Sequence, residues 1–95
     1  MEQKILLKHP AGKKAVSMDK EKYNAIAKSV LYFLKTKGES THTEILKAVI
    51  EDFKKNKTQF KGAIEWHMEW VKLDLEARKN IIRLVDNSPI KFKLA

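Results

Sequence analysis

The chain contains no cysteine, and only two prolines and three glycines interrupt its 95 residues. Without cysteine it can form no disulfide, no thiolate nucleophile and no cysteine-ligated metal site, which fits a reducing cytoplasm. No apolar run approaches the roughly 18 residues that a membrane-spanning helix needs. The opening residues, MEQKILLKHP, have too short an apolar run for a signal peptide and lack its cleavage site. We therefore expect a cytoplasmic protein that does not enter a membrane.

The sequence is equally poor in catalytic patterns. Its histidines, His9, His42 and His67, lie in different segments without the HExxH spacing of a zinc enzyme. The glycines are isolated, so there is no Walker loop and no dinucleotide-binding motif, and a GxSxG nucleophile elbow is also missing. We expect no metal site, no cofactor and no enzymatic activity.

The formal net charge is +8 and comes almost entirely from lysine, since only Arg78 and Arg83 are arginine among twenty basic residues. Lysine attracts phosphate without regard to sequence, whereas arginine reads bases through two parallel hydrogen bonds. The charge therefore points to sequence-independent contact with nucleic acid. A lysine-rich surface also keeps proteins soluble, so both interpretations are open at this point.

Hydrophobic periodicity predicts two amphipathic helices in the first sixty residues. The first begins between Ser17 and Asp19, with Ser17 as the N-cap, and ends at Gly38. The second begins with the capping box of Thr41 and Glu44 and ends near Lys55. Their apolar stripes consist of Tyr23, Ile26, Ala27, Val30, Leu31 and Leu34 in the first helix and Ile45, Leu46, Val49, Ile50 and Phe53 in the second.

A third helix is predicted from Phe60 to Lys79, with Thr58 as its N-cap and Asn80 as its left-handed C-cap residue. Its apolar residues cover more than half of the circumference, so we expect a central helix that is covered on several sides. One polar face is expected to stay exposed. It carries Lys61, Gly62, Glu65, Glu69, Lys72, Glu76 and Lys79.

Three polar residues, His67, Asp74 and Arg78, fall within the apolar arc of this helix. Asp74 and Arg78 are four residues apart and can pair along the helix. We interpret them as a half-buried ion pair accompanied by a hydrogen-bonded histidine, because a buried charge needs a partner. The alternative is a functional polar track.

Short strands are predicted on either side of the helices. Residues 3–8 form the first, and residues 39–41 pair with a C-terminal hairpin whose strands, 81–85 and 90–94, flank a turn at 86–89. In the last strand apolar residues alternate with lysine, so that Ile90, Phe92 and Leu94 face the core and Lys91 and Lys93 face outwards. One core is expected to contain Val30, Leu34, Ile45, Val49, Ile64, Val71, Leu75 and Leu84.

These elements predict an α+β, mainly helical fold, the winged helix-turn-helix, as one domain over residues 1–95. Such domains most often read nucleic acid, as in transcriptional regulators, so we expect duplex DNA as the partner. The glutamates on the polar face of the third helix disfavour a lengthwise fit in the major groove. Contacts are therefore predicted at the start of that helix and on the hairpin, and they comprise Lys54, Lys55, Lys57, Thr58, Gln59, Lys61, Lys91 and Lys93.

A winged helix also serves as a protein-docking module without nucleic-acid binding. In this alternative, exposed Trp66 or Trp70 docks another protein or a second copy of the chain, which would give a homodimer. Scattered rather than contiguous lysines would favour this alternative.

The chain resembles a small family of uncharacterised bacterial proteins that are predicted to fold as winged helices. The resemblance rests on HPAGK at residues 9–13, on Tyr23, on Trp66 and on VKLDLEAR at residues 71–78, and it covers most of the chain. It implies a winged-helix fold and carries no function that can be transferred.

Overall fold

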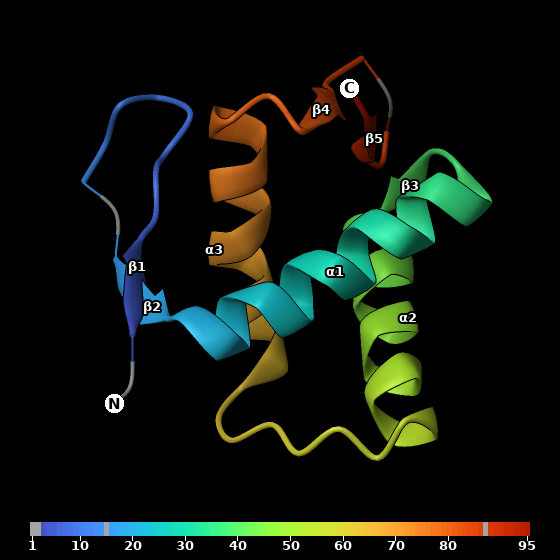
Figure 1. Cartoon of the computed structure of the whole chain (residues 1–95). Coiled ribbons are helices and arrows are strands. Elements are labelled where there is room, and N and C mark those ends of the chain that lie inside the picture. The colour runs from blue at the N-terminus through green and yellow to red at the C-terminus, as the bar shows by residue number, and fades with distance from the viewer. Residues whose placement is uncertain (1–2, 15, 87) are drawn as a thin grey trace.

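The computed structural model describes residues 3–14, 16–86 and 88–95, and within them the chain forms three helices and two small antiparallel sheets (Figure 1). None of the helices in this part of the chain combines the length and the apolar character that a membrane crossing requires. In chain order the elements are β1 (Lys4–Leu6), β2 (Ser17–Asp19), α1 (Lys20–Lys37), β3 (Ser40–Thr41), α2 (His42–Lys55), α3 (Ile64–Ala77), β4 (Ile81–Leu84) and β5 (Lys91–Leu94).

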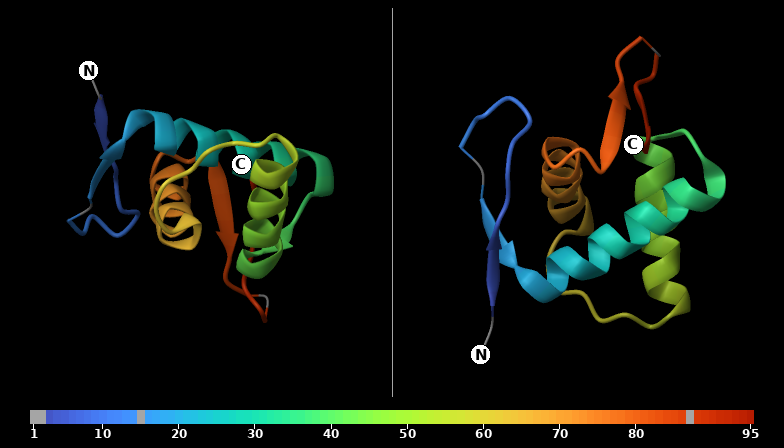
Figure 2. Two further views of the ribbon diagram at one scale, coloured as in Figure 1. Left: turned by 90° about the horizontal axis from the view of Figure 1, so that it is seen from below. Right: turned by 45° about the horizontal axis from the view of Figure 1, so that its top comes forward.

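The longest helix, α1, lies at the centre of the domain and packs against α2, α3 and β5. Figure 2 shows it crossing the two shorter helices, both of which lie on one side of it. Hydrophobic side chains from the three helices and both sheets form one cluster. As predicted, α3 is covered on several sides, since it packs against α1, α2 and β4, but one side stays open and Trp66 of the predicted apolar arc is 47% exposed there.

Most of the predicted core is confirmed. Ile64 is partly buried and packs against the cluster, whereas Leu84 is only partly buried. Ile90, predicted to face inwards, is 40% exposed because it precedes β5, and the inward alternation begins only at Phe92. The remaining predicted core residues are all buried, and they are Val30, Leu34, Ile45, Val49, Val71 and Leu75.

The three-stranded sheet has the order β3-β5-β4, with antiparallel pairing throughout. Ser40 is paired with Phe92 and Thr41 with Lys91, which confirms the predicted pairing of residues 39–41 with the hairpin. Of the turn predicted between the hairpin strands, Asn87 lies outside the described residues.

The N-terminal sheet corrects the predicted start of the first helix. β1 pairs with β2, and Leu6 lies opposite Ser17. Ser17 is therefore held in an extended strand and cannot cap the helix. The N-cap of α1 is Asp19, whose carboxylate accepts a hydrogen bond from the Lys22 N–H.

Of the predicted starts of the second and third helices, one is confirmed and the other is wrong. The capping box of α2 is confirmed, since the Thr41 hydroxyl accepts from the Glu44 N–H and the Glu44 carboxylate accepts from the Thr41 N–H. The predicted start of the third helix is wrong, because α3 begins at Ile64 without a side-chain N-cap and Thr58 lies well before it. Residues 56–63 form a loop, and this loop contains half of the predicted DNA contacts.

Both α2 and α3 are followed by a lysine in the left-handed conformation, where a side chain is strained by its Cβ. Lys57 has φ 53° and Lys79 has φ 63°. After α3, the Asn80 N–H donates to the Leu75 carbonyl and the Lys79 N–H donates to the Glu76 carbonyl, the pattern of a Schellman motif. The left-handed residue is thus Lys79 rather than Asn80, contrary to the prediction.

Replacing Lys79 with glycine is expected to raise the free energy of unfolding by about 0.5–1 kcal/mol, because glycine removes the Cβ strain and keeps the capping hydrogen bonds. Lys79→Ala is the matched control: it removes the same charge, retains the Cβ and should change stability by less than about 0.5 kcal/mol. Urea denaturation measures both. Equal effects of the two substitutions would show that the charge matters and the backbone conformation does not.

Candidate nucleic-acid interface

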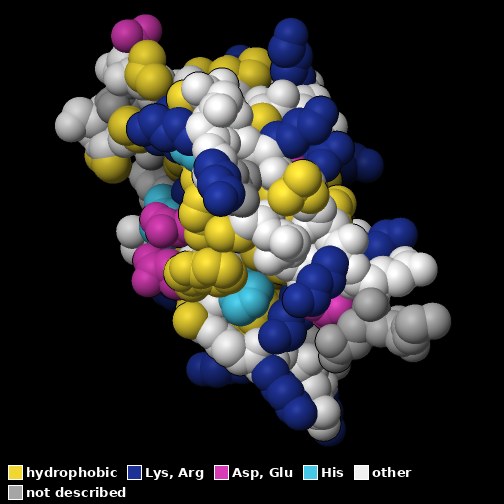
Figure 3. Space-filling view, turned by 90° about the vertical axis from the view of Figure 1, so that its left-hand side faces the viewer, with side chains coloured by type: hydrophobic (Ala, Val, Ile, Leu, Met, Phe, Trp, Pro, Cys, Tyr) yellow, Lys and Arg dark blue, Asp and Glu magenta, His cyan; other side chains and the backbone are white. Residues whose placement is uncertain are grey.

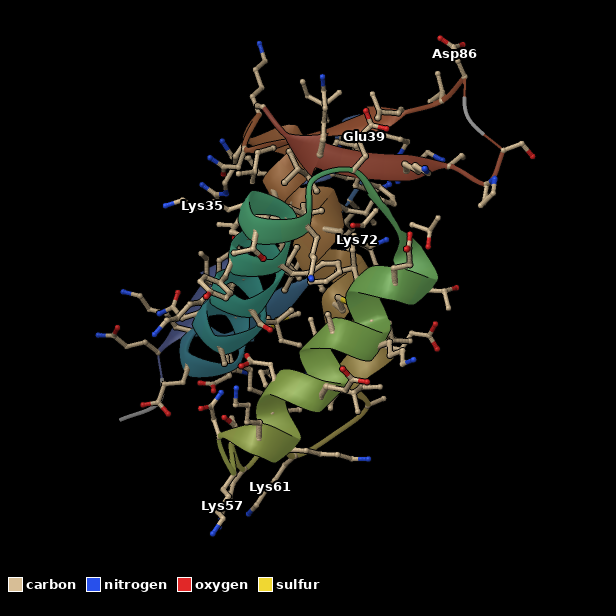
Figure 4. All side chains as sticks on the ribbon, turned by 90° about the vertical axis from the view of Figure 1, so that its right-hand side faces the viewer. Lys35, Glu39, Lys57, Lys61, Lys72 and Asp86 are labelled. Carbon is tan, nitrogen blue, oxygen red and sulfur yellow. The ribbon has the colours of Figure 1, made fainter. Side chains whose placement is uncertain are left out.

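Six of the eight predicted contact residues lie at the junction between α2 and α3, and all six are exposed. Lys54 and Lys55 occupy the last turn of α2. The others belong to the loop that follows, and they are Lys57, Thr58, Gln59 and Lys61. Figure 4 shows Lys57 and Lys61 projecting from one end of the molecule. We call residues 54–61 the basic segment; it is presented by a helix end and a loop rather than by the first turn of α3.

The other two predicted contacts, Lys91 and Lys93, lie on β5. Lys93 is exposed and Lys91 is partly exposed. The hairpin stands at the opposite end of α3 from the basic segment (Figures 1 and 4), and a helix of this length spans about 21 Å. The two groups of lysines therefore lie apart.

The part of α3 between these groups is more acidic than the sequence predicted. Glu65 and Glu69 are exposed, as expected for the polar face. Lys72, assigned to the same face, is only 6% exposed. Glu76 is half-buried and pairs with Arg83 of β4 at 3.2 Å. Contact between the length of this helix and a DNA groove is disfavoured, because exposed carboxylates repel phosphates.

The lysine side chains are not engaged in ion pairs within the described parts of the chain. The ion pairs found there join Arg78 to Asp74 and Arg83 to Glu76, and the contact of the Glu65 carboxylate is with His42 rather than with a lysine. The positive charge of the exposed lysines is therefore available to an anionic partner.

Phe60 anchors the basic segment to the body of the domain. Its ring centroid lies 5.6 Å from that of Phe53 and 4.9 Å from that of His67, which it meets edge-on. The Lys22 ammonium lies 5.7 Å from the same ring centroid. Gly62 has φ 106°, and a Cβ there would come within 3.0 Å of the His67 ring, so the loop requires glycine at this position. These contacts fix the direction in which the loop leaves α2.

Asp74 is completely buried and joins the N-terminal segment to α1 and α3. The Arg78 Nε donates to both carboxylate oxygens, at 2.9 and 3.0 Å, which confirms the predicted pair. The Tyr23 hydroxyl donates to Oδ2. The Lys8 backbone N–H donates to Oδ1 at 2.8 Å. We call these four residues the Asp74 network, and it accounts for the burial of the carboxylate because every group aimed at it is a donor.

His67 lies apart from this network, so the predicted three-residue track reduces to Asp74 and Arg78. The His67 Nδ1 lies 2.7 Å from the Ala63 carbonyl oxygen instead. Within the network, burial and then the hydrogen bond to Asp74 raise the pKa of the Tyr23 hydroxyl far above its ordinary value. The hydrogen bond and the charge of Asp74 likewise raise the pKa of Arg78. Tyr23 therefore stays neutral and Arg78 stays charged at neutral pH, as a structural network requires.

A second polar cluster, not predicted from the sequence, joins α3 to α2 and the three-stranded sheet. The Lys72 ammonium lies 4.0 Å from the Phe92 ring centroid and 2.6 Å from the His42 Nδ1. The His42 Nε2 lies 3.0 Å from the Glu65 carboxylate, so a neutral His42 that carries its proton on Nε2 donates to Glu65 and accepts from Lys72. Burial, followed by the charge of Arg83, lowers the pKa of Lys72 to about 8.

The position of Lys72 on the helix indicates burial, but its charge led to its assignment to the exposed face. The residue lies four positions after Met68 and three before Leu75, both of which are buried. Because the Lys72 side chain is nearly enclosed, its amine is not accessible to a substrate.

Among the described residues, no group of three or more His, Cys, Asp or Glu side chains could hold a metal ion.

In a comparison with known proteins, a family profile matches the chain over residues 4–92. The chain belongs to that family, DUF6958, a family of unknown function. The DUF6958 match includes the basic segment, the Asp74 network and Lys72, and ends just before Lys93. No curated protein and no solved structure matches the chain. Membership of DUF6958 confirms the expected resemblance to an uncharacterised family, and it brings no function with it.

Proposed function

We propose that this DUF6958 domain is a winged helix that binds duplex DNA through phosphate contacts, with little dependence on base sequence. The order α1, β3, α2, α3, β4, β5 supports the winged-helix assignment. So does the pairing of β3 with β5, which ties the helical part to the hairpin. A cytoplasmic location, still a prediction, suits such a partner.

The observation that carries the proposal is the unpaired, exposed charge of the basic segment. Within residues 54–61 four side chains are lysine and none is acidic. Such a segment attracts phosphate strongly at low salt. Thr58 and Gln59 add neutral donors that can meet phosphate oxygens. Lys91 and Lys93 would form a separate contact, because they stand at the other end of α3.

The composition of α3 argues for phosphate contact and against base recognition. Glu65 and Glu69 are exposed on the helix that a sequence-specific winged helix would insert in the major groove. Both described arginines are engaged within the domain, Arg78 with Asp74 and Arg83 with Glu76. The remaining cations are lysines, which bind phosphate as point charges. Binding is therefore proposed to be modest and sensitive to salt.

Replacing Lys57 and Lys61 together with glutamate should weaken binding to every duplex tested. Each phosphate contact contributes about 0.9 to the log–log dependence of affinity on salt, so losing two should flatten the slope by about 2. Fluorescence anisotropy titrations with a short mixed-sequence duplex, at salt concentrations from about 50 to 200 mM, measure both quantities. Glu69→Ala should change the slope little.

The matched control is the pair Lys35→Glu and Lys37→Glu in the last turn of α1, which changes the net charge equally. Figure 4 shows Lys35 far from Lys57 and Lys61. Lys57→Gly is a further control, since it removes one charge and relaxes the left-handed backbone, so weaker binding would not reflect lost stability. Equal weakening by the two charge-reversed pairs, or no binding by the natural sequence at about 50 mM salt, would contradict the proposal.

A second candidate function is docking through the open side of α3, and the exposure of Trp66 favours it. The Trp66 ring lies 4.9 Å from that of His67 and 6.4 Å from that of Trp70, between centroids. An exposed tryptophan backed by other aromatic rings is typical of residues that dominate protein interfaces. The occupant would be a second copy of this chain, in a homodimer.

The two candidates have opposite salt dependences. DNA binding weakens as salt rises, whereas two copies that each carry a charge of +8 repel less when that charge is screened. Sedimentation equilibrium of the natural sequence and of Trp66→Ala separates them. Docking would be favoured over DNA binding if the natural sequence forms a dimer that strengthens with salt, if Trp66→Ala does not dimerise, and if the natural sequence has no affinity for DNA.

A further inference from the structure

A basic hollow lies between the loop at residues 7–14 and the C-terminal end of α3. Its volume is about 590 Å³, within the roughly 300–1,000 Å³ typical of small-molecule sites. Its wall includes the basic side chains of Lys8, His9, Lys13 and Lys14 and the apolar side chains of Leu6 and Ala77. In Figure 1 this loop is the blue segment beside the upper end of α3, at the opposite end of that helix from the basic segment.

One wall of the hollow is tied to buried groups. The Lys8 N–H donates to the Asp74 carboxylate at 2.8 Å. Leu7 is 2% exposed, and its N–H donates to the Val16 carbonyl at 3.0 Å. The Leu6 carbonyl lies 3.5 Å from an Arg78 Nη2. These contacts hold the start of the loop in place before any ligand arrives.

The hollow keeps a strong positive charge. None of the described residues that line it is acidic. The nearest buried carboxylate, Asp74, is already neutralised by Arg78. Figure 3 looks onto this side of the molecule and shows basic side chains around hydrophobic ones, with the acidic side chains mainly along the left edge. An anion entering here would meet cations without a competing carboxylate.

His9, one of the residues that line the hollow, can donate a hydrogen bond from its Nε2. The Ala11 N–H donates to the His9 Nδ1 at 3.0 Å, and the Gly12 N–H donates to the His9 carbonyl at 2.9 Å. Because Nδ1 accepts a hydrogen bond, the neutral imidazole carries its proton on Nε2. The turn thereby leaves Nε2 as the donor of the ring, in a loop that also carries Lys8, Lys13 and Lys14.

We propose that this hollow binds a small phosphate monoester with an apolar body. A phosphate monoester carries up to two negative charges and three acceptor oxygens, so it matches three ammonium groups and an imidazole N–H better than the single charge of a carboxylate does. Leu6 is 69% exposed at the rim, so an apolar body resting on it and on Ala77 would bury hydrophobic surface. This site is independent of the proposed DNA contact.

Calorimetric titrations with phenyl phosphate, inorganic phosphate and benzoate test the proposal. Phenyl phosphate should bind tightest, because inorganic phosphate lacks the apolar body and benzoate lacks the phosphate. Backbone amide NMR shifts on adding phenyl phosphate should concentrate in residues 7–14 and around Ala77. Replacing Lys13 and Lys14 with glutamine should weaken phenyl phosphate by about tenfold or more, since each removes a charge-assisted contact.

His9→Asn isolates the histidine donor. An asparagine side-chain carbonyl accepts from the N–H two residues later, so the turn is kept while the Nε2 donor is lost. We expect phenyl phosphate to bind about fivefold or more weakly, as for one lost hydrogen bond, with unchanged melting temperature. Lys35→Gln with Lys37→Gln, the matched control, should bind as the natural sequence does.

Three results would overturn the site: equal binding of benzoate and phenyl phosphate, amide shifts spread equally over residues 54–61, or full affinity after Lys13 and Lys14 are replaced. If duplex DNA does not bind and phenyl phosphate does, the proposed function fails and this inference stands. The reverse result removes this site alone.

Discussion

Asp74→Ala is expected to lower the free energy of unfolding by about 3–5 kcal/mol, as found when one partner of a buried ion pair is removed. The substitution leaves the Lys8 N–H and the Tyr23 hydroxyl without their acceptor in a site that water does not reach. It also creates a cavity and removes the ion-pair partner of Arg78, whose own side chain is 35% exposed and keeps access to water. Urea denaturation followed by circular dichroism gives the value. Glu69→Ala, an exposed carboxylate on the same helix, is the control and should change stability by less than about 0.5 kcal/mol.

Two further variants attribute the loss to the network. Tyr23→Phe removes one donor and should cost about 1–2 kcal/mol. Combined with Asp74→Ala it should cost less than the sum of the two, because the tyrosine hydroxyl has no acceptor to lose. If Asp74→Ala does not fold, Asp74→Asn keeps a carbonyl acceptor for Lys8 and should fold with reduced stability. An Asp74→Ala protein as stable as Glu69→Ala would refute the structural role of the carboxylate.

Features that depend on residues close together in the sequence were predictable from the sequence. The capping box of α2 needs only Thr41 and Glu44, three residues apart, so its pattern is visible in the sequence. The pair of Asp74 and Arg78 follows from the spacing of one helix turn. The start of α3 was not predictable in this way. Phe60 continues the apolar spacing of the helix, yet its packing against Phe53 holds it in the loop.

The remaining features depend on contacts between distant segments. The Asp74 carboxylate is held by Lys8 and Tyr23, which are 66 and 51 residues away in the chain. Lys72 was placed on the exposed face because its charge outweighed its spacing. Its burial depends on the Phe92 ring and on His42, which no pattern within α3 contains. The separation of the basic segment from the hairpin lysines likewise follows from the direction of α3 in the fold.

The second large effect is expected at alkaline pH, where the free energy of unfolding should rise by about 2 kcal/mol between about pH 8 and pH 10. The pKa of Lys72 is about 8 in the folded chain, against an ordinary value of 10.5. Over that window the unfolded chain binds more protons than the folded chain, so stability increases with pH. The penalty for burying the ammonium is fully present below pH 8 and is relieved as Lys72 loses its proton.

The other groups around Lys72 set the size of this rise. Burial is the main cause of its lowered pKa and Arg83 adds to it, while Glu69, Glu76 and Glu65 oppose it. His42, which accepts from the ammonium, can still accept from the neutral amine, but that hydrogen bond is then no longer charge-assisted. Tyr23 sets the upper end of the pH range in which stability rises. Its pKa is raised in the folded chain, so above the ordinary value of 10.0 the Tyr23 hydroxyl ionises in the unfolded chain first, which favours unfolding.

Lys72→Met tests the assignment, because methionine fills similar space without a titrating group. Stability measured by urea denaturation from pH 7 to pH 11 should rise and then fall in the natural sequence, giving a maximum near pH 10. In Lys72→Met the rise should vanish while the fall remains, and in Tyr23→Phe the rise should remain while the fall is reduced. Lys47→Met, at an exposed position of α2, is the matched control and should keep the full profile. A rise that persists in Lys72→Met would assign the alkaline stabilisation to another lysine, and would mean that the ammonium at Phe92 keeps an ordinary pKa in the folded chain.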